Sequence, residues 1–183
     1  TTQVFRDPTA WYHIVVARDT ATVKMYVNGD EITSFATSTN TGASNVGRWT
    51  YTDQNVIGRY FLSGSDFLGG YLAEVVQIDG QILTPTSFGE ENDEGVWVPI
   101  DPSGLTFGTN GFYLQFKQTG SGQDASGIGA DTSGVGRHWA VAGGAPQSNQ
   151  VTDTCTDKSS DDIGNYATLN PLSPFTFTLS DGN

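Results

Sequence analysis

The fold of this chain is decided by residues 11–35, WYHIVVARDTATVKMYVNGDEITSF. Residues 11–16 form an aromatic and β-branched run that ends at a polar corner, which predicts a strand buried on both faces. Residues 22–28 alternate apolar and polar side chains, as a half-buried antiparallel strand does. Asn28-Gly29 then supplies the two positive-φ positions of a type I′ turn, and the chain returns. The stretch predicts a three-stranded meander.

Strand and turn signals continue beyond this meander. Asp79-Gly80 predicts a second type I′ turn, which leads into a short strand at residues 81–83. Thr84 followed by Pro85 predicts the start of a helix only one turn long. Further strands are predicted at residues 55–62, 70–78, 111–116 and 175–179. No helical apolar stripe persists, so the predicted fold class is all-β.

Length and charge restrict the function. The chain has 183 residues, enough for one domain with an extension. Its net charge is −12, with only 8 basic residues, so we expect no nucleic-acid partner. We also expect no membrane insertion, since no apolar run approaches the ~20 residues that a membrane span requires. Cys155 is the only cysteine, so no intrachain disulfide can form.

Four aromatic residues are candidates for a ligand platform, because aromatic faces stack on sugar rings. They are Trp49, Tyr51, Tyr60 and Phe61. The alternative, which we favour for Trp49 and Tyr51, is that they anchor a loop against the sheet.

Two acidic features suggest a metal site or a plain turn. Glu90, Glu91, Asp93 and Glu94 are four carboxylates in five positions, and we favour a solvated loop over an acidic metal site. Asp131 precedes a glycine-containing turn, where its side chain can cap its own backbone. A calcium site at Asp131 is the alternative, but one carboxylate supplies too few oxygen ligands.

Catalytic patterns are missing from the sequence. A jelly-roll glucanase needs paired acids in the order Glu-x-Asp-x-x-Glu, and no segment supplies it. The two histidines, His13 and His138, accompany no Gly-x-Ser-x-Gly elbow, and we interpret His13 as a hydrogen-bonded core residue. We therefore expect a protein that is not an enzyme and needs no cofactor.

Four segments in order carry a resemblance to laminin-G-like and concanavalin-A-like jelly-roll domains. They are WYHIVV, KMYVNGDEI, NVIGR and GYLAEVVQIDGQILTPTSFG. The resemblance implies an antiparallel β-sandwich, incomplete at the N-terminus, with residues 1–95 as the second half of the sandwich. Residues 96–183 would supply a closing strand, glycine-rich loops and a C-terminal extension. The segment from Asp131 to His138 also resembles a turn of this family, some members of which bind Ca²⁺.

The later segments resemble tail and fibre-like structural proteins of marine bacteriophages. They are GVWVPIDPSGLTFGTNGFYLQF, the turn that starts at Asp131, and NYATLNPL. This resemblance implies a homo-oligomeric tail, fibre or capsid decoration protein on the virion surface, in contact with other virion proteins and with host glycan. The alternatives are a carbohydrate-binding module of an extracellular or cell-surface protein, and a glycosidase-related jelly roll without a catalytic motif.

Overall fold

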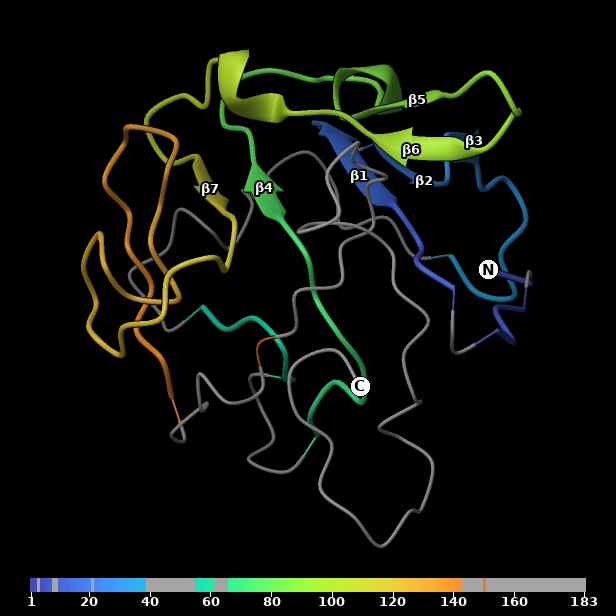
Figure 1. Cartoon of the computed structure of the whole chain (residues 1–183). Helices are drawn as coiled ribbons and strands as arrows, with labels where there is room; N and C mark the ends of the chain where they lie inside the picture. Colours follow the sequence, from blue (N-terminus) through green and yellow to red (C-terminus); the bar gives the residue numbers. More distant parts are fainter. Residues whose placement is uncertain are drawn as a thin grey trace, which may run out of the picture.

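Short antiparallel strands make up the architecture (Figure 1). A computed structural model describes residues 1–2, 4–7, 10–20, 22–38, 55–60, 66–142 and 150. The strands are β1 (Ile14–Asp19), β2 (Thr22–Val27), β3 (Asp30–Glu31), β4 (Val75–Gln77), β5 (Gly89–Glu91), β6 (Trp97–Pro99) and β7 (Phe112–Leu114). Two 3₁₀ turns, η2 (Pro85–Ser87) and η3 (Pro102–Gly104), accompany them. All named strands in these residues pair antiparallel and no α-helix forms, which confirms the all-β class and is consistent with a β-sandwich.

The predicted meander is the first sheet, with strand order β1-β2-β3. Its turn has φ of 50° at Asn28 and 86° at Gly29, which confirms the type I′ prediction. The Asn28 side chain strengthens the turn, because its Oδ1 accepts a hydrogen bond of 2.8 Å from the backbone N–H of His13. The first hairpin is therefore specified locally, by its own turn residues.

Burial of the first strand on both faces was predicted wrongly. Ile14 is 61% exposed and Val16 is 58% exposed, whereas Val15 and Ala17 on the other face are half-buried. Among the residues that the structure describes, β1 is at the edge of the first sheet. An apolar run is buried on both faces only if both are covered, and the described residues leave the face with Ile14 and Val16 open to solvent.

The second sheet joins β4 to β7, and three further predictions near it are corrected. The strand expected at 70–78 is shortened to β4, which follows Glu74 in a left-handed conformation (φ 51°). The type I′ turn expected at Asp79-Gly80 is wrong, because only Gly80 has positive φ. Residues 81–83 form no strand. β4 has its partner more than 30 residues away in sequence, so no local signal predicted the pairing.

Asp79 fixes the turn after β4 to the loop before β7. Its backbone N–H donates to the Phe107 carbonyl at 2.9 Å. Its Oδ2 accepts hydrogen bonds from the backbone N–H and the side-chain amide of Asn110, at 3.0 and 2.9 Å. These contacts extend the β4–β7 pairing and replace the predicted hairpin.

Two other strand predictions are also shortened. Within residues 55–60 the structure has one isolated bridge, Arg59 to Phe67, in place of a strand. β7 is shorter than the predicted 111–116, and Phe116 has a positive φ of 55°. The one-turn helix at Pro85 is confirmed as η2, although Thr84 makes no side-chain capping bond. Cys155 and the strand predicted at 175–179 lie outside the described residues.

Most of the core surrounds β7. Its most completely buried apolar residues are Phe107, Phe112, Tyr113, Leu114 and Ala130, while Val27 and Ile32 are buried at the first sheet. Phe107 stacks on Tyr113 with ring centroids 6.2 Å apart, and Phe112 meets Trp139 edge to face at 5.1 Å. Burial raises the pKa of Tyr113 to about 12. The best-packed region therefore lies outside the stretch that the sequence pattern emphasised.

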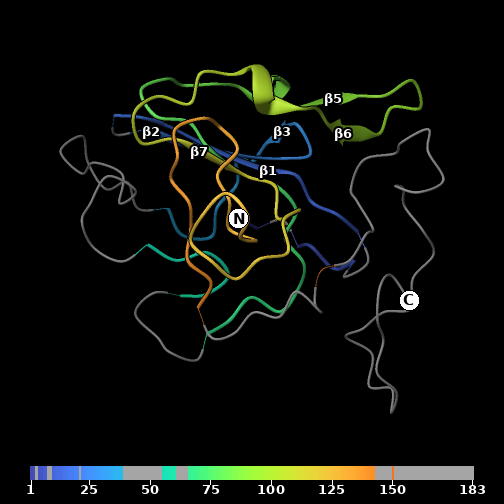
Figure 2. The same ribbon diagram turned by 60° about the vertical axis from the view of Figure 1, so that its left-hand side comes forward.

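The β5–β6 hairpin lies beside the first sheet in both ribbon views (Figures 1 and 2). Trp97 joins the two, because its Nε1–H donates to His13 Nδ1 at 3.0 Å. The ring lies so close to Gly29 and Gly89 that a Cβ on either would be 2.6 Å from it. Since the hairpin spans residues 89–99, the division expected at residue 95 falls inside it.

Candidate functional site

A two-armed ribbon of residues 58–60 and 66–68 carries exposed aromatic side chains. The arms are joined by the antiparallel bridge between Arg59 and Phe67. Tyr60 N–H donates to the Asp66 carbonyl at 2.9 Å, and Leu68 N–H donates to the Gly58 carbonyl at 2.8 Å. These two backbone bonds fix the register of the arms, so the positions of the side chains follow. We call this segment the aromatic ribbon.

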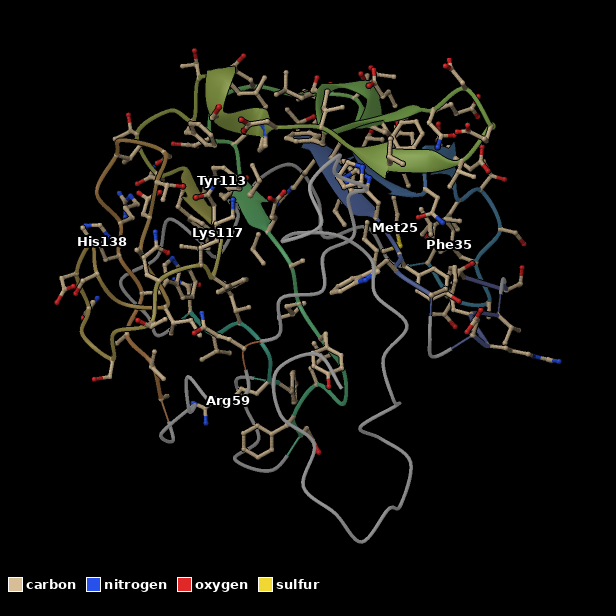
Figure 3. All side chains as sticks on the ribbon, in the orientation of Figure 1. Met25, Phe35, Arg59, Tyr113, Lys117 and His138 are labelled. Atoms are coloured by element: carbon tan, nitrogen blue, oxygen red, sulfur yellow. The ribbon has the colours of Figure 1, made fainter. Side chains whose placement is uncertain are left out.

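The two faces of the aromatic ribbon differ in chemistry. Side chains alternate between faces along a strand, so Tyr60 and Asp66 share one face, and Arg59 and Phe67 share the other. Tyr60 is 53% exposed and Phe67 is 68% exposed. In Figure 3, Arg59 lies on the side of the molecule away from the β5–β6 hairpin, well apart from Tyr113 and His138. The aromatic ribbon therefore presents two distinct surfaces away from the best-packed core.

The face with Tyr60 and Asp66 is suited to a polar ligand with one apolar side. An exposed tyrosine ring offers a flat surface for the apolar face of a sugar ring. A carboxylate accepts hydrogen bonds from hydroxyl groups, and the exposed Asp66 supplies one on the same face. Of the four aromatic residues predicted from the sequence, Tyr60 is the one that the structure describes. Trp49, Tyr51 and Phe61 lie outside the described residues.

Sequence reasoning missed Asp66 as a companion of Tyr60. The sequence predicted one strand at residues 55–62 and gave no reason to place Asp66 opposite Tyr60.

Asp131 organises a second feature, the turn at residues 131–138. It is 7% exposed. Its Oδ1 accepts from the backbone N–H groups of Tyr113 and Ser133, at 2.8 and 2.9 Å. Its Oδ2 accepts from the N–H of Arg137 at 2.8 Å, and its own N–H donates to His138 Nδ1 at 3.0 Å. This is the turn-capping role predicted for Asp131, extended by an unforeseen bond to β7.

The described surroundings of Asp131 stabilise its own negative charge and offer no ligands to a cation. Burial alone would raise its pKa, but the hydrogen bonds from Tyr113, Ser133 and Arg137 outweigh burial and hold the pKa below its usual value of 3.8. N–H donors surround the carboxylate, whereas Ca²⁺ needs six or more oxygen ligands. In the part of the chain that the structure describes, no three His, Cys, Asp or Glu side chains are grouped to hold a metal ion. These contacts give no support to calcium binding at Asp131.

The acidic residues of the β5–β6 hairpin surround its exposed turn. Glu90, Glu91, Asp93 and Glu94 are exposed, and Asn92 Oδ1 accepts from the N–H groups of Glu94 and Val96. The four carboxylates are therefore solvated, which is the interpretation favoured from the sequence. The segment is not only a loop, however, because Glu90 and Glu91 belong to β5.

The two histidines are hydrogen-bonded in structural positions. His13 accepts from Trp97, and burial lowers its pKa from 6.5. His138 accepts from the backbone of Asp131. Because its Nδ1 accepts the hydrogen bond from Trp97, His13 is neutral here, with its proton on Nε2. The prediction that His13 is a hydrogen-bonded core residue is confirmed in a half-buried position.

Comparison with protein families finds a match in the N-terminal part of the chain. Residues 1–86 match a laminin-G-type family model described as the concanavalin A-like lectin/glucanases superfamily. No curated protein and no solved structure matches significantly. None of the helices in the described residues is long and apolar enough to cross a membrane. The N-terminal part of the chain is therefore similar to concanavalin A-like lectins and glucanases, in agreement with its antiparallel sheets.

Proposed function

We propose that this chain is a non-enzymatic, lectin-like module that binds cell-surface glycan through the Tyr60 and Asp66 face of the aromatic ribbon. The observation that carries the proposal is the pairing of an exposed aromatic ring with an exposed carboxylate on one face of a backbone-paired ribbon. The match of residues 1–86 to a lectin and glucanase superfamily supports it. The proposal includes no metal and no cofactor.

The contribution of Tyr60 follows from its exposed area. A tyrosine buries about 200 Å² when fully covered, so the exposed half offers roughly 100 Å² to a ligand. At about 25 cal/mol per Å², covering this area contributes about 2.5 kcal/mol. We therefore expect Tyr60→Ala to weaken glycan binding at least about tenfold, since 1.4 kcal/mol corresponds to a factor of ten.

The experiment is a glycan array followed by titration calorimetry with the glycan that binds most strongly. Phe67→Ala is the matched control, because it removes an exposed aromatic side chain from the opposite face of the same ribbon. Binding that is lost in Tyr60→Ala and Asp66→Ala but kept in Phe67→Ala supports the proposal. Wild-type protein that binds no glycan, or that releases reducing sugar from a bound polysaccharide, contradicts it.

A second candidate is a structural role in a virion appendage, such as a tail, fibre or capsid decoration, located on the virion surface. The observation that favours it is the group of exposed apolar side chains Phe67, Leu68, Tyr71 and Leu72, close together in sequence. Exposed apolar patches on a protein surface commonly mark protein contacts. The partners would be copies of this chain and other virion proteins.

The two candidate functions predict different effects of substitutions on the two faces of the aromatic ribbon. For the structural role, Phe67→Ala should reduce self-association measured by light scattering, while Tyr60→Ala should leave it unchanged. A wild-type protein that stays a monomer up to high concentration and does not bind purified particles would rule out the structural role. An extracellular or cell-surface location is the alternative for a protein that binds glycan alone.

A further inference from the structure

The Tyr60 face of the aromatic ribbon carries a negative charge beside its aromatic ring. The bridge between Arg59 and Phe67 sets Tyr60 directly opposite Asp66, and directly opposed residues have Cβ atoms about 5 Å apart. Both side chains are exposed. A ligand of the size of one sugar unit can therefore contact the tyrosine ring and the carboxylate at the same time.

The charges of the aromatic ribbon are divided between its two faces. Asp66 is on the Tyr60 face together with Leu68, which is 52% exposed. Arg59, the cation among the described residues of the ribbon, is on the other face with Phe67. The described part of the ribbon therefore presents a carboxylate, an aromatic ring and an aliphatic side chain on one face, without a positive charge among them.

The charge of the whole chain acts in the same direction. The sequence has 20 acidic and 8 basic residues, which gives a net charge of −12. Long-range repulsion therefore opposes the binding of sulfated or carboxylated glycans, and long-range attraction favours cationic ones. The local charge of Asp66 and the charge of the chain select for the same class of ligand.

An ammonium group suits the pair of Tyr60 and Asp66 better than a hydroxyl group does. A cation is attracted to the face of an aromatic ring. It also donates a charge-assisted hydrogen bond to a carboxylate, which is stronger than the bond that a neutral hydroxyl donates. A sugar unit with a free amine combines such a cation with an apolar ring face, so one unit can contact both side chains.

We propose that the Tyr60 face of the aromatic ribbon is specific for glycans that carry free amino groups, such as chains of β-linked glucosamine. This inference rests on the proposed function, because it names the class of glycan that binds at the same site. Asp66 pairs with the ammonium group, the Tyr60 ring covers the apolar face of the sugar, and Leu68 flanks it. Acetylation of the nitrogen removes the charge, so N-acetylated glycans bind more weakly.

The test is titration calorimetry of the full chain with two tetrasaccharides, one of β-linked glucosamine and one of β-linked N-acetylglucosamine. The two ligands differ only at the nitrogen. A buffer at about pH 6 keeps amines protonated and carboxyl groups ionised. An exposed ion pair and an exposed cation–π contact together correspond to about tenfold in affinity, so the glucosamine tetrasaccharide should bind about tenfold more tightly.

Two variants show whether Asp66 is responsible for this preference. Asp66→Asn removes the charge but can still form hydrogen bonds with hydroxyl groups. The ratio of the two affinities should fall to about threefold in this variant, because the cation–π contact alone remains. Glu90→Gln is the matched control and should leave the ratio unchanged. It removes the same charge at an exposed position of β5, on the side of the molecule away from Arg59 (Figure 3).

The outcomes separate this inference from the proposed function. A wild type that binds both tetrasaccharides equally, or that binds only other glycans, overturns the amine specificity and leaves glycan binding in place. A preference for glucosamine that Asp66→Asn retains, or that Glu90→Gln lowers equally, also overturns it, because the net charge of the chain then explains the preference. A wild type that binds no glycan contradicts both proposals.

A competition experiment tests whether the sugar ring is needed. Ethanolamine carries an amine without a sugar ring, so it should not displace the glucosamine tetrasaccharide at an equal concentration of amine. Equal displacement would mean that the face binds amines in general, and the specificity for amino sugars would be wrong.

Discussion

Replacing Asp131 by Asn tests whether this buried carboxylate holds the turn at residues 131–138 onto β7. Asn has the same shape, and its Oδ1 can still accept from Tyr113 and Ser133. Its Nδ2H₂ group, however, faces the N–H of Arg137, so that bond is replaced by two opposed donors. The variant therefore removes the charge and one hydrogen bond and leaves the volume unchanged.

The expected loss of stability follows from the three hydrogen bonds that the Asp131 carboxylate accepts. A hydrogen bond to a charged group contributes about 1.5–3 kcal/mol and a neutral one about 0.5–1.5 kcal/mol. The two retained bonds should each weaken by about 1 kcal/mol, and the third should lose about 2 kcal/mol. Relief from burying a charge returns about 1 kcal/mol. The net loss is about 3 kcal/mol, which corresponds to a Tm lower by roughly 6–12 °C for a chain of this size.

Urea unfolding followed by tryptophan fluorescence measures this loss. Asp124→Asn is the control, because Asp124 caps a similar turn at Ser126 but is exposed, so its loss should be smaller. The folded-state pKa of Asp131 lies below 3.8, so its contribution is complete above pH 3.8 and is lost as the pH falls through the folded pKa. The difference between wild type and Asp131→Asn should therefore close below pH 3.8. A difference under about 1 kcal/mol at pH 7 would refute the reasoning.

Three further predictions concern the contact between the first sheet and the β5–β6 hairpin. Trp97→Phe keeps an aromatic ring but loses the donor to His13 Nδ1, so the free energy of unfolding should fall by about 1 kcal/mol in a urea titration. Gly29→Ala should cost more than Gly134→Ala in the same assay, because both positions have positive φ but only Gly29 is packed against Trp97. An NMR titration of His13 should have its midpoint below pH 6.5, since burial disfavours the charged imidazole. The stability that neutral His13 contributes is present above pH 6.5 and is lost as the pH falls towards the folded-state pKa. Trp97→Phe lacks the bond to neutral His13, so its free energy of unfolding should depend less on pH in this range.

The parts of the fold that were predicted from the sequence are those that neighbouring residues determine. Asn28-Gly29 sets its own turn, and Pro85 starts η2, because the required backbone angles are properties of these residues. The pairing of β4 with β7 depends on contacts between distant segments, and a period-2 pattern names no partner. Glu74 adopts positive φ although its residue type does not favour it, so the start of β4 could not be predicted.

The candidate site was predicted in part for the same reason. Tyr60 was identified because an aromatic residue near a loop is recognisable by type alone. Asp66 became relevant only when the bridge between Arg59 and Phe67 set it opposite Tyr60. The bond between His13 and Trp97 spans 84 residues of sequence, and no spacing rule connects them. Asp131 was assigned to its turn correctly, but its bond to Tyr113 required the fold to be known.

The indole of Trp97 fits between two positions that have no side chain, Gly29 and Gly89. Positions 29, 89 and 97 therefore share one fixed volume, although they come from different hairpins. In related chains, a larger residue at position 29 or 89 should accompany a smaller ring or an aliphatic residue at position 97. A set of homologous sequences in which these three positions vary independently would show that the hairpins can dock in more than one way.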